Sequence, residues 1–189
     1  MKFQQRGQYK NPQYYFAREM KEYVDGFGDP SKEFWLGLDK IVSLTNNGAE
    51  LLVELETFEE IEAMIYKSII EILSFQGEKV FARYSSFNVD GPEYRIHVSG
   101  YSGNAGDTMK IDDGMAFSTR DSDKDLWGQD CSSTRGHGGW WFNGCGLANL
   151  NGMNLGNSKS GYNGILWYLY AKDNRSFKST KMMLRKKRI

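Results

Sequence analysis

The sequence lacks several features that would point to a particular class of protein. Its 24 Lys and Arg residues balance its 24 Asp and Glu residues, so the net charge of zero gives no indication of a nucleic-acid partner. No apolar run reaches the roughly 18 residues that a membrane span needs. The first ten residues, MKFQQRGQYK, contain no apolar core of a signal peptide.

The composition fits one domain. A chain of 189 residues is long enough to bury a single hydrophobic core, so we predict one domain over residues 1–189. Aromatic residues make up 14% of the chain and 21 residues are glycine, which suits a compact fold with many tight loops.

An acidic run in the second half of the chain places Asp121, Asp123 and Asp125 two residues apart. Carboxylates at this spacing repel one another, and Ca²⁺, which takes six to eight oxygen ligands, would relieve the repulsion. The run is equally typical of a solvated turn, because Asp favours turns. An EF-hand is excluded, since Leu126 and Ser132 stand where its Gly and Glu are required.

The two cysteines, Cys131 and Cys145, bracket a segment rich in glycine and tryptophan. A disulfide closing a loop of about 15 residues would contribute roughly 3 kcal/mol in the chain-entropy model. Two reduced, buried thiols are the alternative, and two cysteines alone do not decide between them.

Several motifs together resemble a known family. They are FSTRDSDKD (117–125), GGWW (138–141), LANLNG (147–152), EFWLGLD (33–39), ARYSSFNV (82–89), YSGNAGD (101–107) and SFKSTKMM (176–183). In this order they closely resemble the fibrinogen C-terminal domain, over about residues 3–185. Within that family the chain looks most like the branch of ficolin and tachylectin lectins.

The resemblance implies an α+β fold with a twisted, mostly antiparallel sheet, flanking helices and a loop-rich subdomain that holds calcium and a ligand pocket. It implies a disulfide between Cys131 and Cys145. It also implies a Ca²⁺ site with the ligands Asp123 and Asp125 through their side chains and Trp127 and Gln129 through their carbonyls. In this interpretation the ion has a structural role and holds the loop beside the pocket.

In the lectin branch of the family, the pocket beside this site binds acetyl groups of N-acetylated sugars through an aromatic wall and outward-facing backbone N–H groups. By resemblance, Gly144 and Cys145 would be joined by a cis peptide bond that turns those groups outward. Tyr162 would form one wall of the pocket, with Asn163 beside it. Residues 140–142 (WWF) are predicted to be buried supports rather than sugar platforms.

Three positions depart from the lectin pattern. Gly146 replaces the histidine that usually follows the second cysteine, and Arg135 and Arg175 replace aromatic residues of the pocket. The two arginines would favour an anionic ligand, either a sialic acid or an acidic peptide, because a guanidinium binds a carboxylate through two parallel hydrogen bonds.

Hydrophobic periodicity predicts the elements around this loop. Pro12 is a plausible helix start, with apolar residues at helical spacing up to Val24. The remaining predicted elements are a helix over 38–44, strands over 51–55, 79–89 and 94–99, and a short helix over 105–112. An insert relative to the family, residues 60–76, has the pattern of an amphipathic helix.

The resemblance also implies where the protein is located and how it assembles. Family members are secreted, and their domains begin with a small subdomain that this chain lacks, so we expect an extracellular protein with an incomplete N-terminus. Asn174 begins a glycosylation sequon. Family members usually form oligomers, because multivalency compensates for a weak single pocket.

The sequence and the resemblance leave two possible functions. An enzyme is not expected, because no nucleophile that could pair with His97 or His137 is visible in the sequence. The leading interpretation is a secreted, calcium-dependent lectin of innate immunity that binds N-acetylated or anionic glycans. The alternative is a protein-binding module of the angiopoietin or tenascin kind, acting in adhesion, signalling or coagulation-like interactions without binding sugar. Gly146, Arg135 and Arg175 favour the alternative.

Overall fold

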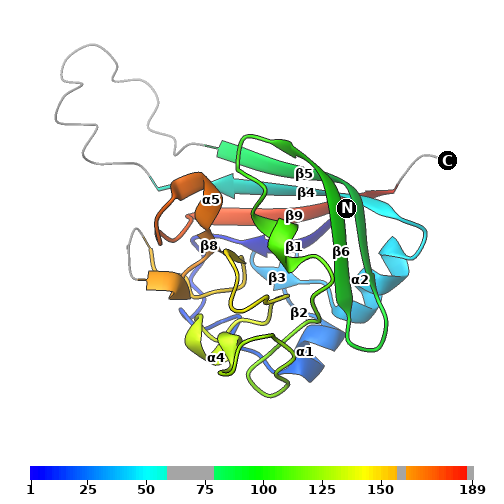
Figure 1. Ribbon diagram of the computed structural model, residues 1–189. Coiled ribbons are helices and arrows are strands. Elements are labelled where there is room, and N and C mark those ends of the chain that lie inside the picture. Colours follow the sequence, from blue (N-terminus) through cyan, green and yellow to red (C-terminus); the bar gives the residue numbers. More distant parts are fainter. Residues whose placement is uncertain (59–78, 157–160, 187–189) are drawn as a thin grey trace, which may run out of the picture.

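The computed structural model describes residues 1–58, 79–156 and 161–186. Figure 1 shows the elements in chain order. They are β1 (Lys2–Arg6), α1 (Met20–Asp25), β2 (Phe27–Gly28), β3 (Phe34–Trp35), α2 (Leu38–Thr45), β4 (Ala49–Glu56), β5 (Lys79–Asp90), β6 (Arg95–Gly103), η1 (Thr108–Asp112), α4 (Cys131–Thr134), β7 (Ala148–Asn149), η2 (Gly161–Asn163), β8 (Leu166–Trp167), α5 (Tyr168–Ala171) and β9 (Ser179–Lys186).

A seven-stranded sheet in the described part of the chain has the order β2-β3-β1-β9-β4-β5-β6, and its neighbouring strands pair antiparallel. The last strand, β9, lies between β1 and β4, so the two ends of the described chain meet within the sheet. The N–H of Leu184 donates to the carbonyl of Met1 at 2.7 Å. The strands β7 and β8 form a separate two-stranded ribbon.

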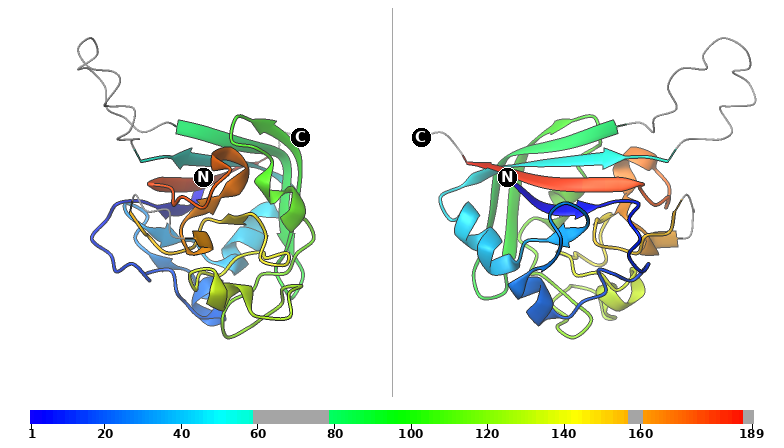
Figure 2. Two further views of the ribbon diagram at one scale, coloured as in Figure 1. Left: turned by 60° about the vertical axis from the view of Figure 1, so that its left-hand side comes forward. Right: turned by 180° about the vertical axis from the view of Figure 1, so that it is seen from behind.

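One face of the sheet carries the core. In β4, Leu51, Val53 and Leu55 are buried, whereas Glu54 on the opposite face is exposed. This alternation is typical of an antiparallel sheet that is covered on one side only. Figures 1 and 2 show α1, α2, α4 and the long loops gathered on one side of the central strands.

A chain of aromatic rings joins the sheet to the loop-rich half. Tyr23 packs on Trp35 with ring centroids 5.5 Å apart, Trp35 on Phe117 at 5.7 Å, and Phe117 on Trp141 at 5.0 Å. These rings are at most 1% exposed, and such pairs add about 0.5–1.5 kcal/mol each beyond the area they bury. Trp140 and Phe142 are also fully buried, which confirms that residues 140–142 support the loops from within.

A buried ion pair ties β1 to the same loops. Arg6 in β1 lies 3.0 Å from the carboxylate of Glu33, with both side chains almost fully buried. The guanidinium also donates to the carbonyl of Gly152 at 2.7 Å and lies 4.0 Å from the ring centroid of Phe16. These bonds offset part of the cost of burying the charge.

The first helix differs from its prediction. A helix beginning near Pro12 is wrong: residues 12–17 form turns, and α1 begins only at Met20, after a capping box. The reason is a tertiary contact: Phe16 is buried against Arg6 of β1, and this packing outweighs the local helical spacing. Phe16 and Tyr23, which belong to the apolar spacing behind that prediction, are both buried.

The remaining elements follow the periodicity closely. The helix predicted over 38–44 is α2, and the strands predicted over 51–55, 79–89 and 94–99 are β4, β5 and β6, with ends that differ from the prediction by one to a few residues. The short helix expected over 105–112 is the 3-10 turn η1. The insert at 60–76 lies outside the described residues. Of the helices that are described, none is long and apolar enough to cross a bilayer.

Candidate binding site

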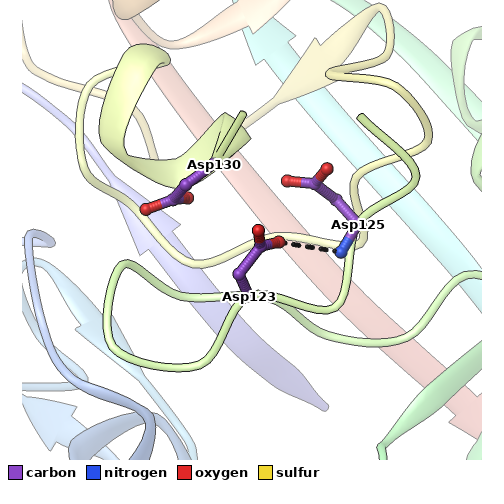
Figure 3. Close-up of side chains that lie close together, drawn as sticks. All are labelled: Asp123, Asp125 and Asp130. Carbon is purple, nitrogen blue, oxygen red and sulfur yellow. Dashed lines mark hydrogen bonds between the residues drawn. The ribbon is translucent and has the colours of Figure 1, made fainter. Parts of the chain in front are cut away.

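Three carboxylates converge in the loop before α4. One oxygen from each of Asp123, Asp125 and Asp130 lies within 4.8 Å of the other two. Figure 3 shows Asp123 reaching toward the backbone of Asp125, whose N–H donates to it at 3.1 Å. Asp125 accepts the N–H groups of Trp127 and Cys131 at 2.7 and 2.8 Å. The side chain of Asp130 caps α4 by accepting the N–H of Ser133 at 3.1 Å.

The surroundings of Asp125 disfavour the charged form of its carboxyl. Burial raises the pKa of the Asp125 carboxyl above its usual value, and the charge of Asp123 raises it further. Hard oxygen ligands at this separation suit Ca²⁺, whose oxygens lie roughly 2.3–2.6 Å from the ion. The donor set therefore fits the metal that the resemblance implies, and Asp130 is a carboxylate that the sequence interpretation did not include.

The other residues of the predicted calcium site lie in the same loop. Trp127 and Gln129 are exposed between Asp125 and Asp130. Asp121, which is not among the predicted ligands, accepts the N–H of Met20 at 3.0 Å. The acidic loop is thus attached to the start of α1.

The predicted disulfide is confirmed. Cys131, the first residue of α4, is bonded to Cys145, with their Cα atoms 5.0 Å apart. Both residues are buried. The crosslink joins the acidic loop to the turn at 143–146.

That turn corrects the sequence prediction. The peptide bond before Cys145 is trans, and the described chain contains no cis peptide bond. Instead, Gly144, Cys145 and Gly146 have φ values of 47°, 69° and 57°. Three successive left-handed residues reverse the chain without a cis bond, and glycine on both sides lowers the steric cost of this conformation. The N–H of Gly146 closes the turn on the carbonyl of Asn143 at 2.8 Å.

A buried carboxyl lies beneath the turn. Asp112 in η1 is inaccessible to solvent, and the indole N–H of Trp140 donates to one of its oxygens at 3.3 Å. The other oxygen has no hydrogen-bond partner among the described residues. Burial raises the pKa of the Asp112 carboxyl well above its usual range, whereas the Trp140 bond lowers it. A Cβ at Gly146 would lie 2.9 Å from the unpartnered oxygen, so Gly146 leaves room for Asp112.

Two pairs of an aromatic and a basic side chain lie beside the end of α4, and the tyrosine of each pair is exposed. The guanidinium carbon of Arg135 lies 4.0 Å from the ring centroid of Tyr162, and Tyr162 is 38% exposed. Two residues later, His137 packs against the ring of Tyr14, which is 54% exposed, with centroids 6.1 Å apart. These four residues are called the aromatic–arginine patch below.

The backbone under this patch is closely packed. A Cβ at Gly136 would lie 2.1 Å from the carbonyl oxygen of Asn163, so the segment after α4 and η2 touch there. That carbonyl also accepts the N–H of Met153 at 2.8 Å, and the side chain of Asn149 donates to the carbonyl of Arg135 at 2.6 Å. The patch therefore rests on a base held by several hydrogen bonds.

The two arginines proposed for the pocket have different partners in the structure. Arg175 forms an ion pair with Asp173 at 2.9 Å, with a second bond from its Nε at 3.0 Å. Arg135 is stacked on Tyr162 and belongs to the patch. Tyr14 and His137 were missed by the sequence interpretation, because nothing in the sequence places the N-terminal segment beside the cysteine loop.

The fold and the comparisons together define the class of protein. The sequence profile of the family described as "Fibrinogen beta and gamma chains, C-terminal globular domain" matches residues 2–187. The chain therefore belongs to the fibrinogen C-terminal domain family, and the predicted α+β fold of that family is confirmed.

Its curated relatives include human angiopoietin-2, which is 37% identical over 175 residues covering 90% of this chain and 32% of the relative. The chain thus spans about a third of the length of the curated relatives it matches. The fibrinogen-like globe domain of human ANGPTL2 superimposes with a TM-score of 0.81 at 33% identity, covering 98% of this chain and 79% of that one.

A third similar structure is a lamprey fibrin D-dimer, complexed with the peptide ligand Gly-His-Arg-Pro-amide. It has a TM-score of 0.76 at 28% identity and covers 97% of this chain and 60% of that one.

These relatives correct the predicted function. The lectin interpretation is wrong as the leading one, because angiopoietins and angiopoietin-like proteins are protein-binding signalling modules. The placement in the ficolin and tachylectin branch is not confirmed. The alternative drawn from Gly146, Arg135 and Arg175 is the one that the relatives support.

Proposed function

We propose that this domain is an extracellular protein-binding module of the angiopoietin kind, and that the aromatic–arginine patch is its contact surface. The observation that carries the proposal is the exposure of Tyr14 and Tyr162 on a closely packed base. Exposed tyrosine beside arginine is the composition of protein interfaces, where aromatic residues and Arg are enriched.

The arrangement also lowers the cost of binding. Stacking on Tyr162 already restricts Arg135, and contact with His137 already restricts Tyr14. Side chains that are ordered before binding lose less conformational entropy when a partner arrives. A preformed patch of this kind suits a folded protein or an extended peptide. The lamprey fibrin fragment, which is complexed with a short peptide, is a precedent within the fold.

The same proposal covers the cellular context. The Cys131–Cys145 disulfide is expected to persist in an oxidising compartment, which supports an extracellular location. No catalytic role is proposed, because the family's domains are binding modules.

We also propose that the acidic loop binds Ca²⁺. Asp123, Asp125 and Asp130 supply carboxylates at a suitable separation, and the carbonyls of Trp127 and Gln129 are the further ligands that the resemblance implies. The ion would neutralise the repulsion between the carboxylates and hold the loop that leads into α4. Since α4 ends at the patch, loss of the ion is expected to loosen the patch as well.

The proposal is tested by presenting the domain to two panels side by side, one of immobilised extracellular receptor ectodomains and one of glycans. We expect saturable binding to at least one ectodomain and only background binding to N-acetylated and sialylated glycans. Tyr162→Ala and Tyr14→Ala should each weaken ectodomain binding about thirtyfold or more, because truncating a central interface tyrosine costs about 2 kcal/mol or more.

Phe81→Ala is the matched control, since Phe81 is 41% exposed but lies on β5, within the sheet. It should bind the same ectodomain as tightly as the unmodified domain. Saturable binding to glycans without binding to any ectodomain would contradict the proposal. Equal losses in Phe81→Ala and Tyr162→Ala would place the contact surface elsewhere.

A further inference from the structure

Arg135 differs from most other arginines of the described chain in its surroundings; Arg83, which is exposed on β5, is the other one without a carboxylate at ion-pairing distance among the described residues. Most of the others lie within ion-pairing distance of a carboxylate. These are Arg6 with Glu33, Arg18 with Glu22, Arg95 with Glu93, Arg120 with Glu19, Arg175 with Asp173 and Arg185 with Glu50. Arg135 has no carboxylate at that distance among the described residues, and its contact is the ring of Tyr162.

The hydrogen-bonding capacity of Arg135 is also unused. A guanidinium has five N–H donors in one plane, and within the described chain none of them donates to another residue. The side chain is half-buried rather than extended into solvent, and burial lowers its pKa. A partly desolvated cation that lacks an anion gains more from one than a fully hydrated cation does.

The stacking on Tyr162 defines what that anion must look like. With its carbon 4.0 Å from the ring centroid, the guanidinium is covered by the aromatic ring on one side. Its N–H edges stay available for an acceptor beside the ring. The planar fork of N–H groups matches the two oxygens of a carboxylate, and lysine has no equivalent geometry.

We propose that Arg135 binds an aspartate or glutamate side chain of the protein partner, and that it thereby determines which partners the patch accepts. This inference rests on the proposed function of the patch. Tyr162 is the positioning residue, because its ring holds the guanidinium. Arg175 takes no part in this recognition, since its guanidinium already donates hydrogen bonds to the carboxylate of Asp173.

The test uses an array of nonapeptides with mixed flanking residues and a fixed central Asp, Glu, Asn, Gln or Lys. The full chain is applied at a series of concentrations. We expect peptides centred on Asp and Glu to bind about tenfold or more tightly than those centred on Asn and Gln. The preference should weaken as salt is raised.

Variants then assign the preference to one side chain. Arg135→Gln should abolish it, and Tyr162→Phe, which keeps the ring, should retain it. Arg83→Gln is the matched control, because Arg83 is exposed on β5 and its loss changes the net charge equally. The thermal midpoint of each variant is measured, so that misfolding is separated from lost recognition.

Equal binding of Asp- and Asn-centred peptides overturns the inference, as does a preference that survives Arg135→Gln. An array without signal for any acidic peptide overturns it too. None of these results contradicts the proposed function. That proposal fails only if the domain binds no ectodomain of the panel, or if Tyr14→Ala and Tyr162→Ala leave ectodomain binding unchanged.

Discussion

The buried carboxyl of Asp112 makes a sharp prediction about stability and pH. Asp112 is inaccessible to solvent, has one donor in Trp140, and keeps one oxygen unpartnered beside Gly146. Its raised pKa means that the folded protein holds this proton at pH values where the unfolded chain has lost it. Asp112→Asn keeps the shape of the side chain and removes the titration.

The direction of the effect follows from proton linkage. A carboxyl whose pKa is raised by folding contributes its full stability below the unfolded pKa, which is about 3.9, and loses it as the pH rises toward the folded pKa. With one proton of difference between the states, the loss is about 1.4 kcal/mol per pH unit. For a domain of this size that corresponds to a thermal midpoint falling by about 3–6 °C per pH unit relative to Asp112→Asn.

The measurement is thermal or urea unfolding of both proteins at half-unit steps from pH 4.5 to 8. The advantage of Asp112→Asn should grow with pH and then level off above the folded pKa. Asp112→Ala also lacks the titration but leaves a cavity, so its curve should have the same slope as that of the Asn variant at a lower stability. Curves for the unmodified protein and Asp112→Asn that stay parallel over this range would refute the reasoning.

Three further predictions concern the rest of the domain. Replacing Cys131 and Cys145 with serine should lower the free energy of unfolding by about 3 kcal/mol, measured in urea, because the disulfide constrains the unfolded chain. Ca²⁺ at 100 times its dissociation constant should add about 2.7 kcal/mol, measured as a rise in the thermal midpoint that Asp123→Ala abolishes. Arg6→Ala should cost about 3–5 kcal/mol in urea unfolding, because it leaves a buried charge without its partner.

Each of the three has its own control. Reducing agent should not change the urea concentration at which the double serine variant unfolds. If reducing agent also leaves the unfolding of the unmodified domain unchanged, the first prediction is contradicted. A thermal midpoint of the unmodified domain that changes with neither Ca²⁺ nor EDTA would contradict the second prediction. Arg185→Ala breaks an exposed ion pair and should cost under about 1 kcal/mol, so a similar loss for Arg6→Ala would contradict the third.

Local sequence predicted most elements well, and the helix predicted from Pro12 is an exception with a physical reason. The alternation in β4 and β5 was readable because a strand covered on one side repeats every two residues. The helix predicted from Pro12 failed because the burial of Phe16 against Arg6, from a different part of the chain, outweighs local helical spacing.

The prediction of a cis peptide bond in the turn at 143–146 was wrong for another reason. Its resemblance to the family suggested a cis bond, but the two glycines of this chain allow a left-handed turn that reverses the chain with trans peptides. A glycine in the sequence indicates that the backbone can adopt positive φ values at that position. The sequence does not show which of several possible turns the surrounding packing selects.

The sequence by itself determined the family, the strand pattern, the disulfide partners and the acidic run, because each depends on residue type at short spacing or on motifs that extend along most of the chain. Only the tertiary structure brought Arg135 onto Tyr162, Tyr14 onto His137 and Asp112 beneath Gly146. Those contacts join loops that are far apart in the chain, and the packing of the sheet and core decides which of them meet.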